Sequence, residues 1–263
     1  MPTLAYLEEL ARGAGEILSA GFGQAHQVEH KGVVDPVTEI DRRSEAYLLE
    51  KIHKQFPEHR IVAEESGGLD GSDDSLWYVD PLDGTVNYAH GLPIFSVSIA
   101  FAEKGRTTLG VVYNPAQNEL YSAEEGRGAR LNGETITVSK TDNLDGSLVV
   151  TGFPYDRRTN PENNLDHFNR FALRAQGVRR LGSAALDLCY VAAGRVDGFW
   201  EVRLNPWDVA AGALIVEEAG GRVTGMDGSP FDAAAAHLVA SNGRVHDEML
   251  TVIREFRARK GTD

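Results

Sequence analysis

The sequence contains a single cysteine, fewer basic than acidic residues, and no long apolar run. Among its 263 residues only Cys189 is a cysteine, so no internal disulfide can form, and a reducing compartment fits this composition. Cys189 lies within the apolar helical run 184–193, and we interpret it as an inert core residue. No Ser–His or Cys–His signature indicates a covalent nucleophile.

Two further absences exclude classes of location and partner. No apolar run reaches the roughly 18 residues that a membrane span requires, and no basic segment followed by an apolar core stands at the N-terminus. We therefore expect no membrane partner, no signal peptide and a cytoplasmic location. The net charge of −13, from 26 basic and 39 acidic residues, argues against a nucleic-acid partner, because such binding depends on basic patches. An acidic enzyme with an anionic substrate would need bound cations.

The remaining composition is that of a globular protein, with 42% hydrophobic and 25% charged residues. An exposed loop is expected over 66–75. Periodicity predicts helices over 4–20, 41–56, 163–175, 183–193, 207–219 and 245–256. It predicts strands over 61–63, 77–79, 95–101, 108–113, 118–123, 129–131, 134–138, 148–150, 197–201 and 237–240, and a strand segment at Val223. A helical and antiparallel first half, followed by alternating elements, indicates an α+β fold of layered sheets and helices.

The segment 77–88, Trp-Tyr-Val-Asp-Pro-Leu-Asp-Gly-Thr-Val-Asn-Tyr, is the most informative part of the chain. Asp80 and Asp83 lie around a proline where a buried strand ends, and paired carboxylates in such a turn can hold hard cations such as Mg²⁺. The amides of Gly84 and Thr85 could hold a phosphate if these residues open a helix. The alternative is an ordinary turn, since Asp, Pro and Gly are all common turn residues.

Three other acidic clusters lie at the ends of predicted elements. Asp41 ends the block 35–41, Glu64 and Glu65 follow a short strand, and Asp208 begins an apolar helix. Capping is the alternative for Asp41 and Asp208, and solvated loop charge is the alternative for the glutamates. Four such clusters together are not easily explained by capping alone. A site for two or three Mg²⁺ ions needs about this many carboxylates.

These blocks, in this order and spacing, resemble the inositol monophosphatase family. The resemblance rests on Asp-Pro-Val-Thr-Glu-Ile-Asp (35–41), Ala-Glu-Glu-Ser (63–66), the 77–88 segment and Trp-Asp-Val-Ala-Ala-Gly (207–212). Gly-Ser-Ala-Ala-Leu-Asp-Leu (182–188) and Gly-Arg-Val-Asp-Gly-Phe-Trp-Glu (194–201) look like further family blocks. The match covers nearly the whole chain. It implies a layered α-β-α-β-α sandwich of the sugar-phosphatase type.

The resemblance also implies a set of metal ligands. By position, Glu64, Asp80 and the carbonyl of Leu82 would hold a first Mg²⁺ ion. Asp80, Asp83 and Asp208 would hold a second, so that Asp80 bridges the two. A third, weaker ion would rest on Glu64 and water.

Catalytic and substrate-binding residues follow from the same resemblance. The catalytic group would be Glu64, Thr85 and Asp41, with Thr85 hydrogen-bonded toward Asp41 and positioning the attacking water. Phosphate and hydroxyl contacts would come from Asp83, Gly84, Thr85, Ser183, Ala184, Glu201 and Asp208. Residues 1–140 would then carry the antiparallel sheet and most metal ligands. Residues 141–263 would add Asp208 and substrate contacts within one integrated fold.

The activity implied is Mg²⁺-dependent hydrolysis of a phosphate monoester by metal-activated water. Glu201 and the compact chain length favour a polyol substrate, with myo-inositol monophosphate first. Histidinol phosphate, fructose 1,6-bisphosphate and 3′-phosphoadenosine nucleotides remain alternatives on the same scaffold. Arg179, Arg180 and Arg203 could steer an anionic substrate, although exposed arginines often have no specific role. Another class also stays open: a non-catalytic or dual-role binding partner of the transcription machinery. The resemblance implies a homodimer and lithium sensitivity.

Overall fold

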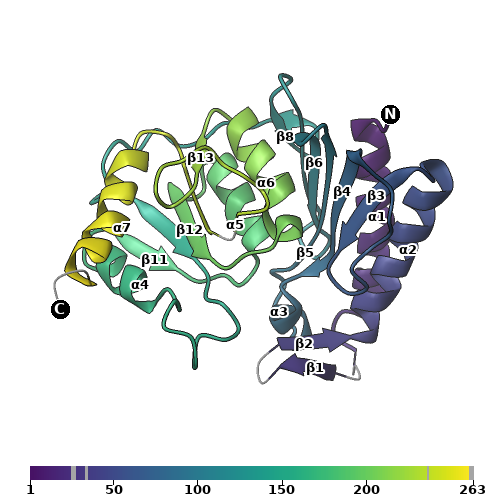
Figure 1. Ribbon diagram of the computed structural model, residues 1–263, viewed down its shortest axis with the longest axis horizontal. Coiled ribbons are helices and arrows are strands. Elements are labelled where there is room, and N and C mark those ends of the chain that lie inside the picture. Colours follow the sequence, from purple (N-terminus) through teal and green to yellow (C-terminus); the bar gives the residue numbers. More distant parts are fainter. Residues whose placement is uncertain (25–27, 33–34, 236, 261–263) are drawn as a thin grey trace.

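The protein is a layered sandwich in which helices and two sheets alternate (Figure 1). The computed structural model describes residues 1–24, 28–32, 35–235 and 237–260, and the side chains of 1–24, 39–235 and 237–255. The side chains of the Asp35–Thr38 block and those of residues 25–34 before it lie outside the described set. The layers follow the order α-β-α-β-α, so the expected architecture is confirmed.

The outer helical layer consists of α1 (Leu4–Gly21) and α2 (Glu39–Gln55), which pack on one face of the larger sheet (Figure 1). Helix α1 buries an apolar stripe at helical spacing, and Thr3 caps it by accepting a hydrogen bond from the amide of Tyr6 at 3.3 Å. Helix α2 ends two residues before Pro57, which cannot continue a helix. Because α2 begins at Glu39, Asp41 lies in its first turn and the N-cap alternative for Asp41 is wrong.

The larger sheet has seven strands in chain order, and all pairs are antiparallel except the parallel pair of its first two strands. The strands are β3 (His59–Ala63), β4 (Ser72–Asp83), β5 (Ser96–Glu103), β6 (Arg106–Asn114), β7 (Glu119–Glu124), β8 (Ala129–Leu131) and β9 (Glu134–Thr135). The loop expected over 66–75 is too long, because pairing extends β4 back to Ser72. The strand expected over 134–138 stops at Thr135, since the amide of Val138 instead bonds the carbonyl of Ala219.

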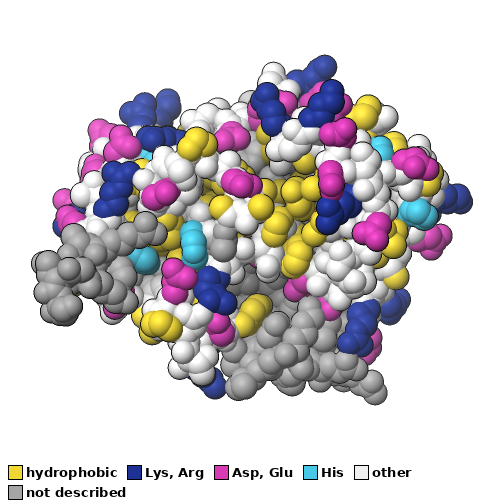
Figure 2. Space-filling view, in the orientation of Figure 1, with side chains coloured by type: hydrophobic (Ala, Val, Ile, Leu, Met, Phe, Trp, Pro, Cys, Tyr) yellow, Lys and Arg dark blue, Asp and Glu magenta, His cyan; other side chains and the backbone are white. Residues whose placement is uncertain are grey.

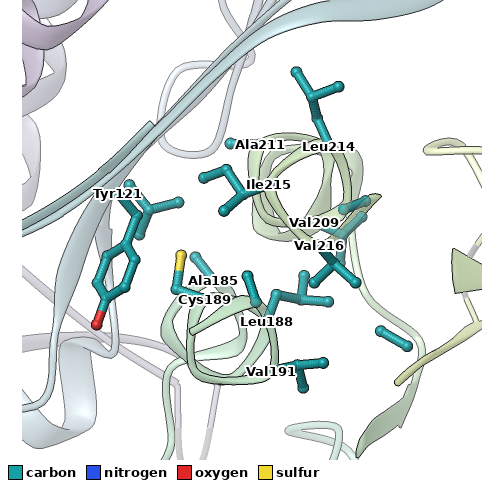
Figure 3. Close-up of a cluster of buried hydrophobic side chains, with 14 of the residues drawn as sticks. Tyr121, Ala185, Leu188, Cys189, Val191, Val209, Ala211, Leu214, Ile215 and Val216 are labelled. Carbon is teal, nitrogen blue, oxygen red and sulfur yellow. The ribbon is translucent and has the colours of Figure 1, made fainter. Parts of the chain in front are cut away.

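The middle layer consists of α5 (Ala184–Ala192) and α6 (Pro206–Glu218), buried between the two sheets. Their apolar side chains meet one another and Tyr121 of β7 (Figure 3). Close approach of α6 to β6 depends on Gly110, since a Cβ there would lie 2.9 Å from the carbonyl oxygen of Ala211. Cys189 is fully buried in this layer, as expected of a core residue.

The smaller sheet has five strands in the order β11-β10-β12-β14-β13. They are β10 (Leu148–Thr151), β11 (Gly177–Arg179), β12 (Gly198–Val202), β13 (Arg222–Thr224) and β14 (His237–Ser241). Helices α4 (Leu165–Ala172) and α7 (His246–Lys260) cover its outer face (Figure 1), where Phe171 stacks on Trp200 with ring centroids 3.9 Å apart. The helix expected over 163–175 is shorter at both ends, because Asn164 has a left-handed backbone and Leu173 caps the C-terminus.

Three small elements complete the chain. Strands β1 (Val28–Gly32) and β2 (Asp35–Thr38) form an antiparallel pair, and α3 (Thr85–Ala89) follows the acidic turn. Sequence periodicity did not predict β1, β2 or β11. Among the described residues no helix combines the length and the apolar character needed to traverse a bilayer. The larger sheet ends at Thr135 and the smaller sheet begins at Leu148, on either side of the boundary expected between residues 140 and 141. The division of the chain into the halves 1–140 and 141–263 stays a prediction.

A buried histidine at the start of α7 predicts an acid-sensitive stability. His246 is fully buried between Thr224 and Ser241, whose hydroxyl oxygens lie 2.9 Å from its Nε2 and Nδ1. Because the Thr224 hydroxyl donates to the carbonyl of Gly225 at 2.8 Å, it accepts from Nε2–H, which leaves Nδ1 to accept from Ser241. Both nitrogens are thus satisfied in the neutral ring.

Burial lowers the pKa of His246 from 6.5 to about 4, so the unfolded chain takes up this proton more readily than the folded one. The buried neutral ring of His246 should contribute on the order of 3 kcal/mol to the free energy of unfolding above pH 6.5. We expect this contribution to be lost as the pH falls from 6.5 to about 4. Urea unfolding of wild type and His246→Gln across this range tests the prediction. The carboxylates titrate equally in wild type and in His246→Gln, so a difference in pH dependence comes from His246. Parallel curves of unfolding free energy against pH would contradict the prediction.

Candidate active site

One pocket brings together most of the sequence-predicted site residues. It has a volume of about 120 Å³ and lies where β3 and β4 end and where α3, α5 and α6 begin. Its wall contains six acidic residues and two arginines. The predicted residues in the wall are Glu64, Asp80, Leu82, Asp83, Gly84, Thr85, Ser183, Ala184, Glu201 and Asp208. The remaining predicted residue, Asp41, lies behind the wall and contacts Thr85.

The acidic turn is built by local hydrogen bonds and one special glycine. Asp80 is 1% exposed, and its Oδ1 accepts a hydrogen bond from the amide of Leu82 at 2.9 Å. This local hydrogen bond is one that the turn alternative expects, and it is compatible with a site because Asp80 still lines the pocket. The strand does not end at Val79, however: β4 continues to Asp83, with an irregular register between Asp80 and Asp83. Gly84 has φ +92°, and a Cβ there would lie 2.9 Å from the carbonyl oxygen of Ile94. Helix α3 begins at the next residue, as predicted.

Thr85 and Asp41 form the buried hydrogen bond that the resemblance implies. The Thr85 hydroxyl lies 3.0 Å from Oδ1 of Asp41 and 3.1 Å from the carbonyl oxygen of Leu82. Asp41 is 1% exposed and Thr85 6% exposed, so the pair is shielded from bulk water although Thr85 reaches the pocket. The contact joins residues 44 positions apart, from the first turn of α2 to the first turn of α3.

Asp83 connects the acidic turn to α5. Its Oδ2 accepts hydrogen bonds from the Ser183 hydroxyl at 2.5 Å and from the Ala185 amide at 2.8 Å. Ser183 is the N-cap of α5 and accepts from the amide of Leu186 at 3.4 Å. These contacts hold the end of β4 and the start of α5 together at one pocket wall.

Asp208 is the third residue of α6, and its Oδ2 accepts a hydrogen bond from the amide of Asn205 at 2.7 Å. Asn205 is the N-cap, so the capping alternative holds in the form of a capping box rather than an N-cap. Asp208 also lines the pocket, so the same residue caps the start of α6 and faces the site.

Glu45 is a functional candidate that the sequence analysis missed. This α2 residue is 3% exposed, and its two carboxylate oxygens accept from the amides of Glu65 at 2.8 Å and Ser66 at 2.9 Å. It thereby fixes the turn that presents Glu64. The available signal was its spacing, because Glu45 lies one helical turn after Asp41 on the same face.

Mutual repulsion and burial raise the carboxylate pKa values. For Asp80 burial is the largest cause, followed by repulsion from Glu64 and then from Asp83 and Asp208. Burial raises the pKa of Asp83 to about 6 and that of Asp208 to about 7. Burial also raises the pKa of Glu201 to about 8, with repulsion from Asp208 next. Cations would relieve this repulsion.

The donor set fits a hard divalent cation. Carboxylate and carbonyl oxygens are the ligands that Mg²⁺ prefers, and the pocket offers both kinds. Among the described residues no three His, Cys, Asp or Glu side chains are already placed around one metal position. Asp83 and Asp208 each use one oxygen in a protein hydrogen bond, which holds their carboxylates toward the helix starts.

Comparison with known proteins shows the family to which the chain belongs. The sequence profile of the inositol monophosphatase family matches residues 2–258. The chain belongs to the inositol monophosphatase family. An inositol-1-monophosphatase from Synechocystis sp. is 50% identical over 242 residues, covering 91% of this chain and 84% of that protein. The Nus factor SuhB from Escherichia coli (strain K12) is 44% identical, covering 97% of this chain and 96% of that protein.

A solved inositol monophosphatase shows that the fold is shared. The structure from Anabaena (Nostoc) sp. PCC 7120 superposes with a TM-score of 0.87 at 45% identity, covering 96% of this chain and 95% of that one. The layered fold expected from the sequence is therefore the fold of the inositol monophosphatase family. Its family blocks converge on one pocket in this chain.

The arginines considered as steering groups divide into two sets. Arg180 and Arg203 line the pocket, and Arg203 forms an ion pair with Asp156 at 3.0 Å. Arg179 is exposed on β11 and donates to the carbonyl of Val178, outside the pocket wall. A pocket residue without a predicted role is Asp187 of α5.

Proposed function

We propose that this protein hydrolyses a phosphate monoester in a Mg²⁺-dependent reaction, with myo-inositol monophosphate as the preferred substrate. The observation that carries the proposal is the convergence of Glu64, Asp80, Asp83 and Asp208 on one pocket beside the Thr85–Asp41 hydrogen bond. The name of the Synechocystis relative supports the choice of substrate.

The metal ligands are assigned as in the sequence analysis. Glu64, Asp80 and the Leu82 carbonyl would hold one Mg²⁺ ion, and Asp80, Asp83 and Asp208 a second. Bound Mg²⁺ would make a water molecule more acidic and offset negative charge on the phosphate and the leaving oxygen. Glu45 would support this arrangement by keeping the turn of Glu64 in place.

The chain's own residues would orient the attacking water. The Thr85 hydroxyl donates toward Asp41, so its lone pairs can accept a hydrogen bond from water. Glu64 lies across the same pocket and can accept the second water proton. No covalent enzyme intermediate is needed for this reaction.

The opposite side of the pocket would bind the phosphate and the alcohol. The amides of Gly84 and Thr85 would contact phosphate oxygens at the start of α3. Ser183 and Ala184 of α5, Glu201 of β12 and the pocket faces of Asp83 and Asp208 would contact the alcohol. Glu201 rests against Gly152, where a Cβ would lie 2.2 Å from its Oε1, so a larger residue at 152 would displace the Glu201 carboxyl group.

A substrate panel tests the proposal. Phosphate release is measured from inositol 1-phosphate, histidinol phosphate, fructose 1,6-bisphosphate and an adenosine 3′,5′-bisphosphate, each with Mg²⁺ and with chelator. Mg²⁺-dependent release that is fastest from inositol 1-phosphate supports the proposal. Faster release from another member would replace the substrate, and no release from any would reject hydrolysis of these esters.

Glu201→Gln is expected to raise the KM for inositol 1-phosphate about tenfold while leaving the Mg²⁺ requirement unchanged. The reason is that a carboxylate hydrogen bond to a substrate hydroxyl is worth about 1.5–3 kcal/mol, of which an amide keeps part. Steady-state kinetics and Mg²⁺ titration of both proteins measure these quantities. An unchanged KM would remove Glu201 from the substrate site.

A second role is supported by the name of the Escherichia coli relative, a Nus factor. A chain that both hydrolyses phosphate esters and binds a transcription complex would keep binding when the acids are removed. The double variant Asp80→Asn, Asp208→Asn should abolish turnover and retain that binding in a pull-down with the host's transcription complexes. On the face shown in Figure 2, Lys and Arg side chains are interspersed with Asp and Glu, which favours a protein partner over direct nucleic-acid binding.

The homodimer, lithium sensitivity and cytoplasmic location implied by the sequence stay predictions.

A further inference from the structure

Asp187 lies on the face of α5 that forms the pocket wall. It follows Ser183 by four residues and Ala184 by three, and residues at these spacings share one face of a helix. Ala185, Leu188 and Cys189 point instead into the apolar layer between the sheets (Figure 3). The sequence of α5 therefore places one acidic residue among otherwise apolar neighbours, on the side of the site.

The Asp187 carboxyl is buried and incompletely bonded. Its side chain belongs to a residue that is 1% exposed, and Oδ1 has no hydrogen-bond partner among the described residues. Leaving a buried acceptor without a partner costs about 1–3 kcal/mol, and such groups in native proteins call for an explanation.

The charged groups around Asp187 associate it with Glu201, on the side of the pocket proposed to bind the substrate's alcohol. Burial raises the pKa of Asp187, and repulsion from Glu201 is the next cause, ahead of Asp83. Arg180 acts in the opposite direction on both Asp187 and Glu201. Among the charged groups, Glu201 therefore has the largest effect on Asp187, followed by Asp83.

We propose that Asp187 is a specificity-determining residue that, together with Glu201, binds hydroxyl groups of the substrate's alcohol. The inference rests on the proposed phosphomonoesterase function and adds a residue to it. Two carboxyls from α5 and β12 can engage neighbouring hydroxyls, since a hydroxyl both donates and accepts hydrogen bonds. The matching ligand is a phosphorylated polyol, and a substrate without hydroxyls gains nothing from this pair.

The test compares a polyol ester with an ester that has no hydroxyl groups. Phosphate release from inositol 1-phosphate and from p-nitrophenyl phosphate is measured for wild type, Asp187→Leu and Asp187→Asn. We expect Asp187→Leu to lower kcat/KM for inositol 1-phosphate at least about tenfold through KM, and to leave p-nitrophenyl phosphate within about twofold. Asp187→Asn keeps shape and hydrogen-bonding capacity and should recover part of the loss.

Several outcomes separate the alternatives. Equal losses for both substrates, or a changed Mg²⁺ requirement, would overturn the assignment and make Asp187 a structural or metal-linked residue. Unchanged kinetics with inositol 1-phosphate would also overturn it. Wild type that hydrolyses p-nitrophenyl phosphate but no polyol ester would instead reject phosphorylated polyols as the substrate class. If Asp187→Leu fails to fold, Asp187→Asn decides alone, since a KM increase confined to the polyol ester is still required.

Discussion

Replacing Asp80 with asparagine is expected to lower Mg²⁺-dependent phosphate release by about three orders of magnitude. Asp80 is the one acid proposed to contact both ions, and the charge stabilisation that metals supply is worth several kcal/mol. The substitution keeps the shape of the side chain and its hydrogen bond from the Leu82 amide. Initial rates with saturating inositol 1-phosphate, across a Mg²⁺ titration, measure the loss.

The same variant should be more thermally stable than wild type when Mg²⁺ is chelated. Asp80 is buried beside three other acids, so removing its charge relieves repulsion in the metal-free protein. Mg²⁺ should raise the melting temperature of wild type and have little effect on Asp80→Asn. Asp70→Asn is the matched control, because Asp70 is exposed in the loop before β4. Wild-type rates or a wild-type Mg²⁺ shift in Asp80→Asn would contradict the ligand assignment.

Replacing Thr85 with valine is expected to lower kcat by about a hundredfold or more. Valine has nearly the shape of threonine, but it removes the hydroxyl that lies between Asp41 and the pocket. Positioned proton-accepting groups contribute typically about 10²–10⁴-fold to a rate. Thr85→Ser keeps the hydroxyl and should retain most of the activity, so this pair separates the hydrogen bond from packing.

Loss of the hydroxyl should also cost about 1–3 kcal/mol of stability, because a buried hydrogen bond to a carboxylate is removed. Thermal melts of Thr85→Val and Thr85→Ser measure this separately from turnover. The Mg²⁺ concentration for half-maximal rate should stay unchanged. A kcat for Thr85→Val within about threefold of wild type would exclude the water-positioning role, since that role predicts a loss of at least about a hundredfold.

Local sequence signals were reliable where a residue type is needed for a backbone conformation. Asp80, Pro81 and Gly84 predicted a sharp turn and a helix start. The structure has an Asp80–Leu82 hydrogen bond, a left-handed Gly84 and a helix start there, although β4 continues to Asp83. The long amphipathic helix α1 was predicted to within one residue because its apolar stripe is continuous. Short strands such as β11 carry too few residues for periodicity to be detected.

The sequence by itself therefore determined most of the regular elements, the acidic turn and, through the motif order, the family. Only the tertiary structure decided which other acids join the site. Glu45 looks like one more charged residue on a helix, and Asp187 like an isolated acid in an apolar run. Their roles depend on what packs against them: the Glu65 and Ser66 amides for one, and the pocket wall for the other. Such contacts join distant segments, so burial and partners exist only once the layers have packed.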